Sequence, residues 1–143
     1  MTVKTVKEWL NNGRNLDTEL KQLREERKIA LDLACSCTAV CGNEKVQSST
    51  KNTSDGKFAA YTEYSAMIDK KEFDLLAYKS RMHNLINQLD NPTYRELLSL
   101  RYINCKTWKQ IAEDMHYTTR NVLKIHGGAL KLLSTITDDK NLS

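Results

Sequence analysis

The segment 118–124 reads TTRNVLK and places hydroxyl, guanidinium, amide and ammonium groups within two helical turns. Arg can form paired hydrogen bonds with guanine, and Asn can do so with adenine. If Val122 faces a core, Arg120 and Asn121 point outward together with Thr119, Leu123 and Lys124. This pattern therefore predicts a helix end that contacts base edges in double-stranded DNA.

Phosphate contacts are expected beside these base contacts. A helix N-terminus presents backbone N–H groups and the positive end of its dipole to an anion. Lys109 lies on the preceding predicted helix, and His126 follows one turn after Val122. The predicted DNA-binding residues are Thr118, Thr119, Arg120, Asn121, Lys124, Lys109 and His126.

Catalytic and cofactor chemistry has no comparable pattern. The three histidines are scattered, and no phosphate-binding glycine loop or paired-carboxylate motif occurs. Cys35, Cys37 and Cys41 form a C-x-C-x3-C run, but the second pair of a structural zinc site is missing. We therefore expect no enzyme, no cofactor and no metal, with the cysteines as free thiols.

Three short helices are predicted to position the candidate DNA-binding residues. Asn91 and Pro92 begin the first helix, Thr107 and Gln110 form a capping box for the second, and Thr118 caps the third. Their apolar stripes predict that Trp108 and Ile111 pack against Val122 and Ile125. The stripe of the third helix comprises Val122, Ile125, Ala129, Leu132 and Leu133. Residues 92–137 thus predict a helix-turn-helix unit.

Heptads before residue 91 predict two long helices that pack lengthwise. The two series are Trp9, Leu16, Leu23, Ala30, Cys37 and then Tyr61, Ile68, Leu75, Met82, Leu89. Arg27 and Lys71 interrupt the seams. We expect helices at about 15–36 and 57–89, joined by a mobile polar loop at about 42–56. The predicted fold is all-α, with an antiparallel helical hairpin over residues 1–91 and the helix-turn-helix unit after it.

The stretch LLSLRYINCKTWKQIAEDMHYTTRNVLKIHGGALKLL resembles the region-4 helix-turn-helix of sigma-70-type factors, which recognises the −35 promoter element. The order of features is similar to small sigma-like late transcription regulators of phages of Gram-positive bacteria, the ArpU/RinA-like group. The resemblance is specific over about residues 92–134 and architectural over 14–91. Cys105 replaces the usual turn glycine, so we expect it to adopt a positive φ. Leu123 takes an outward position often filled by a polar residue, and Gly127–Gly128 lies inside the third helix.

Charge is concentrated where this resemblance implies DNA contact. Residues 93–137 carry seven Lys and Arg against three Asp and Glu, whereas residues 1–92 carry fourteen against thirteen. Such a surplus favours phosphate binding. No apolar run is long enough to span a bilayer, so we expect a cytoplasmic protein of a bacterial host with no membrane contact.

These observations lead to one main functional hypothesis and two alternatives. The main hypothesis is a phage- or prophage-encoded, sequence-specific transcription regulator that acts at late promoters with host RNA polymerase. Its helical hairpin would serve as a homo-oligomer or polymerase contact, or as a passive scaffold. One alternative is a DNA-packaging protein resembling a small terminase subunit, which binds phage DNA as a ring. The other is a protein-interaction module without DNA binding.

Overall fold

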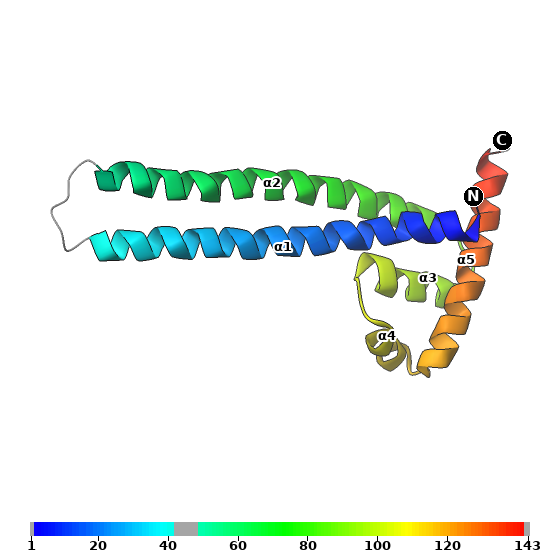
Figure 1. Ribbon diagram of the computed structural model, residues 1–143. Coiled ribbons are helices and arrows are strands. Elements are labelled where there is room, and N and C mark those ends of the chain that lie inside the picture. Colours follow the sequence, from blue (N-terminus) through cyan, green and yellow to red (C-terminus); the bar gives the residue numbers. More distant parts are fainter. Residues whose placement is uncertain (1, 42–48, 142–143) are drawn as a thin grey trace. The chain divides into compact units, whose positions relative to one another are not determined.

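The computed structural model describes residues 2–41 and 49–141, and within these ranges every regular element is a helix. The elements are α1 (Val3–Cys41), α2 (Ser49–Ile86), α3 (Pro92–Leu98), the π-helical turn η1 (Ser99–Ile103), α4 (Trp108–Met115) and α5 (Thr119–Asn141) (Figure 1). The predicted all-α class is confirmed.

Both long helices depart from their expected bounds, and α2 ends at Ile86 rather than near Leu89. α1 begins at Val3 rather than near Asn15, because Val6 and Leu10 are fully buried and Thr2 Oγ1 accepts the backbone N–H of Thr5 at 3.2 Å. α2 begins at Ser49, so the second part of the predicted polar loop is helical. Its polar residues cost less than about 0.7 kcal/mol each relative to alanine, which does not prevent a helix. Residues 42–48 of that loop lie outside the described residues.

The chain divides into two compact units, each with parts of α1 and α2. Unit 1 comprises Met1–Asp17 and Leu75–Ser143, and unit 2 comprises Thr18–Asp74. Unit 1 therefore combines the start of α1 and the end of α2 with all the later helices.

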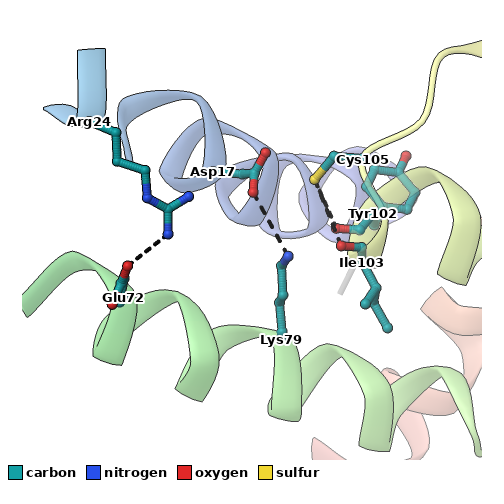
Figure 2. A network of polar contacts seen from close by, with 7 residues as sticks. All are labelled: Asp17, Arg24, Glu72, Lys79, Tyr102, Ile103 and Cys105. Carbon is teal, nitrogen blue, oxygen red and sulfur yellow. Dashed lines mark hydrogen bonds and ion pairs between the residues drawn. The ribbon is translucent and has the colours of Figure 1, made fainter. Parts of the chain in front are cut away.

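The core of unit 1 is built from every one of these segments. Its buried residues are Val6, Leu10, Met82, Ile86, Leu89, Leu97, Leu98, Tyr102, Ile111, Ala112, Val122, Ala129, Leu130 and Leu133. Gly13 allows a close approach of α1 to α2, because a Cβ there would lie 2.7 Å from Met82 Cε. Nearby, the Trp9 and Tyr78 rings pack with centroids 5.1 Å apart, and Lys79 Nζ lies 3.9 Å from Asp17 Oδ1 (Figure 2).

Unit 2 pairs α1 with α2 along a thin apolar seam. Among the side chains that the structure describes in this unit, those of Leu20, Ala34 and Ile68 are buried. The two polar seam residues find partners: Arg27 Nη1 donates to Ser65 Oγ at 3.5 Å, and Lys71 forms an ion pair with Glu19. Arg24 and Glu72 form a further ion pair at 2.7 Å (Figure 2). Ion pairs and a hydrogen bond therefore connect α1 to α2 beside the apolar seam of this unit.

Candidate nucleic-acid interface

Local capping fixes the ends of α3 and α4, as the sequence predicts. Asn91 Oδ1 accepts the backbone N–H of Thr93 at 2.9 Å, one residue after Pro92 opens α3. At α4, Thr107 Oγ1 accepts the Gln110 N–H at 3.2 Å, while the Thr107 N–H donates to Gln110 Oε1 at 3.0 Å. Both predicted caps are confirmed, and they satisfy N–H groups that the helices leave without intrahelical partners.

A tight turn separates α4 from α5. His116 closes α4 with φ 59° and ψ 39°, in the left-handed region. The N–H of Tyr117 donates to the Ala112 carbonyl at 3.0 Å. Thr118 Oγ1 then accepts the Asn121 N–H at 3.2 Å, which confirms the predicted cap of α5. Only two residues, Tyr117 and Thr118, stand between the left-handed residue and the first helical residue of α5.

Five of the predicted DNA-binding residues form one exposed surface at the start of α5. We name this surface the α5 N-terminal face; its residues are Thr118, Thr119, Arg120, Asn121, Leu123 and Lys124, all exposed. Leu123 belongs to it by exposure, although it is not among the residues predicted to bind DNA. Val122, in the middle of the segment, is fully buried in the core. Lys109, on α4, is also exposed.

His126 is the exception among the predicted DNA-binding residues. Its side chain is only 6% exposed, and its Nε2 lies 2.7 Å from Tyr102 Oη in a buried hydrogen bond. It therefore does not line the α5 N-terminal face, and we no longer assign it a DNA contact. It also replaces Leu132 in the buried stripe of α5, since Leu132 is 40% exposed.

His126 belongs to an aromatic network that sequence reasoning missed. Its ring packs edge-on against Trp108, with centroids 4.7 Å apart, and Arg101 lies over the Trp108 ring with Cζ 4.0 Å from its centroid. The Arg101 Nη1 donates to the Lys106 carbonyl at 3.0 Å. These residues come from η1, α4 and α5, so the network fixes the two helices that carry the exposed cations. No sequence spacing connects such distant residues.

Burial determines the protonation of this network. Desolvation lowers the pKa of His126 to about 4, and the charges of Lys7 and Arg101 act in the same direction. Burial likewise raises the pKa of Tyr102 to about 12. The Tyr102–His126 pair is therefore neutral near pH 7, which suits an interior position.

The backbone before α4 has two unusual features. In η1 the Asn104 N–H donates to the Ser99 carbonyl at 2.9 Å, an i to i+5 bond that widens the helix. Cys105 follows with φ 56°, as expected where the resembling family has glycine. Its Sγ lies 3.7 Å from the Tyr102 carbonyl and 3.9 Å from that of Ile103 (Figure 2). This turn directs the chain from η1 into the capping box of α4.

Positive charge is concentrated in unit 1. This unit has thirteen Lys and Arg against eight Asp and Glu, whereas unit 2 has nine against ten. The net charges are therefore +5 and −1. An excess of cations around exposed hydrogen-bond donors favours a polyanionic ligand.

Neither a metal site nor a membrane span is found in the described part of the chain. No group of three or more His, Cys, Asp or Glu residues is placed to hold a metal ion there. Neither Cys35 nor Cys105 is part of a disulfide, while the side chains of Cys37 and Cys41 lie outside the described residues. None of the described helices is both long enough and apolar enough to cross a membrane.

Comparison with known proteins finds one family. Residues 36–134 match the model of a family described as "Protein of unknown function (DUF1492)". No curated protein and no solved structure matches the chain. Because the match covers more than half of the 143 residues, the chain belongs to the DUF1492 family.

Proposed function

We propose that this protein is a sequence-specific transcription regulator that binds double-stranded DNA through a helix-turn-helix formed by α4, the His116–Thr118 turn and α5. The observation that carries the proposal is the α5 N-terminal face. It presents an Arg, an Asn, a Lys and two hydroxyls to solvent at the start of a helix whose opposite side is held in a core. This is the end of a recognition helix that meets base edges in the major groove.

The residues divide into two roles. Arg120 and Asn121 occupy the first turn of α5 and can form paired hydrogen bonds with guanine and adenine. Lys124, one turn later, and Lys109, on α4, are exposed cations suited to phosphates. The backbone N–H groups at the start of α5 add a phosphate site of their own. Direct readout and phosphate anchoring are therefore supplied by different side chains.

The wider context follows from the sequence resemblance. We propose that the protein is encoded by a phage or prophage and acts at late promoters together with host RNA polymerase. The paired helices α1 and α2 would form an antiparallel hairpin that contacts polymerase or a second copy of the chain. A single binding unit with a net charge of +5 makes few phosphate contacts, so a second contact would raise the affinity.

The first test is selection of bound sites from random duplexes by the full-length protein, followed by affinity measurements at two salt concentrations. Arg120→Ala should cost roughly 1–3 kcal/mol on the selected site and relax the preference at one base pair. Lys109→Ala should weaken binding to selected and scrambled duplexes alike and flatten the salt dependence. Arg81→Ala removes an equal charge from an exposed position on α2 and serves as the matched control.

Two results would contradict the proposal. Equal losses on both duplexes for Arg120→Ala would show that α5 does not read bases. A sedimentation mass corresponding to a ring of subunits would favour the DNA-packaging alternative over a promoter-binding regulator.

A further inference from the structure

Leu123 is an apolar side chain on an otherwise polar surface. It is 47% exposed, while its neighbours on the α5 N-terminal face are hydroxyl, amide and cationic residues. Folding does not explain this leucine, because Val122, Ala129 and Leu133 already fill the core side of α5. An exposed leucine contributes hydrophobic free energy only when a ligand removes its surface from water.

The position of Leu123 on the helix directs it toward the same ligand as Arg120. Residues three and four apart are neighbours on a helix surface, so Leu123 lies beside Arg120 and Thr119. Long side chains in a helix also lean toward its N-terminus, and Leu123 therefore covers the turn that holds these two residues. That turn is the part of α5 nearest to the bases in the proposed complex.

Only one major-groove group is a chemical match for an apolar side chain that stands among hydroxyl, amide and cationic residues on its helix face. Thymine carries a C5-methyl group there, whereas adenine, guanine and cytosine present hydrogen-bonding atoms. A protein partner would need a larger surface, because interfaces bury roughly 800 Å² on each partner around a clustered apolar centre. The single leucine, flanked by Arg120 and Lys124, fits a methyl group better than such a centre.

We propose that Leu123 is a specificity-determining residue that selects thymine by apolar contact with its C5-methyl group. This inference rests on the proposed function and adds a base that Arg120 and Asn121 do not read. The test uses the selected duplex with each thymine replaced in turn by deoxyuridine, which removes the methyl group and leaves base pairing intact.

Wild-type protein should bind about fourfold more weakly when one particular thymine is replaced, as expected for one methyl group returned to water. Leu123→Ala should bind that thymine duplex and its deoxyuridine counterpart equally. Leu132→Ala, which truncates a leucine of similar exposure on the same helix, should retain the wild-type sensitivity. Thermal melting of both variants establishes that they fold, since each replaces an exposed side chain.

The outcomes are distinguishable. If a site is selected but no deoxyuridine replacement weakens binding, or if Leu123→Ala remains sensitive, the methyl contact is wrong while the proposed function stands. If Leu123→Ala binds every duplex as wild type does but no longer supports transcription, Leu123 contacts a protein instead. If no preferred site emerges from the selection, the proposed function and this inference fail together.

Discussion

Acidification should destabilise the protein through His126. The ring is buried against Tyr102 and Trp108, and its pKa is lowered to about 4 in the folded protein, whereas an unfolded histidine titrates near 6.5. Below pH 6.5 the His126 ring of the unfolded chain therefore binds a proton, whereas the buried ring of the folded chain does not. The stability that the neutral, buried His126 contributes is fully present above about pH 6.5 and is lost as the pH falls toward 4.

The size of the effect follows from the two pKa values. A difference of about 2.5 units between them corresponds to roughly 3 kcal/mol once both states have titrated. Between about pH 7.5 and about pH 5 the linkage relation gives a loss of about 2 kcal/mol from this group. Carboxylates begin to titrate below that range, which makes pH 5 a suitable lower limit.

The assay is urea unfolding at these two pH values, followed by tryptophan fluorescence, because Trp9 and Trp108 both lie in unit 1. His126→Gln is the matched variant, since glutamine is neutral at both pH values and can hydrogen-bond with Tyr102 Oη. Wild-type protein should lose about 2 kcal/mol more than the variant between the two conditions. Equal losses would show that His126 becomes charged freely in the folded state, and the buried network would be wrong.

Four further substitutions test the packing of unit 1. Ile111→Ala removes a fully buried side chain and should cost on the order of 2–5 kcal/mol in unfolding free energy; an unchanged denaturation midpoint would contradict the assigned core. Gly128→Ala should destabilise the protein because its Cβ would lie 2.8 Å from Tyr94 Oη. At Gly127→Ala the new Cβ meets nothing within 4 Å, so this variant should stabilise the protein by up to about 1 kcal/mol. A change in melting temperature of the same sign for both variants would refute this contrast. Cys105→Gly should stabilise by about 1 kcal/mol by relieving a positive φ, and a lower melting temperature would show that the thiol contacts matter more.

The features that sequence reasoning predicts best depend on neighbours within four residues. The caps at Asn91, Thr107 and Thr118 are all present, because each is made by one side chain and a backbone N–H two or three residues later. The positive φ of Cys105 also follows from a local turn. The second heptad series locates the buried residues Ile68, Leu75 and Met82 in α2, and Leu89 in the turn that follows it. Periodicity is sufficient where one face of a helix is buried along its length.

Features that depend on tertiary contacts were not predictable in the same way. Val6 and Leu10 are buried because α3, η1, α4 and α5 complete a core around them, and no local signal reports this. Gly13 has a low helix propensity, yet it lies inside α1 because Met82 needs the space. His126 resembles an exposed polar residue in sequence, and only its contacts with Tyr102 and Trp108 show it to be interior.

The orientation of the proposed recognition helix is set by its buried side and not by the residues that would read DNA. Val122, His126, Ala129 and Leu133 follow the helical period and are all buried. Advancing α5 by one residue would turn it by about 100° and move Val122 and Leu133 out of the core, at a cost of several kcal/mol. Arg120 and Leu123 are exposed, so core packing does not restrict which side chains occupy these positions. They can therefore change with little effect on folding. Under the proposed function, a single scaffold would then carry different DNA sequence preferences on its α5 N-terminal face.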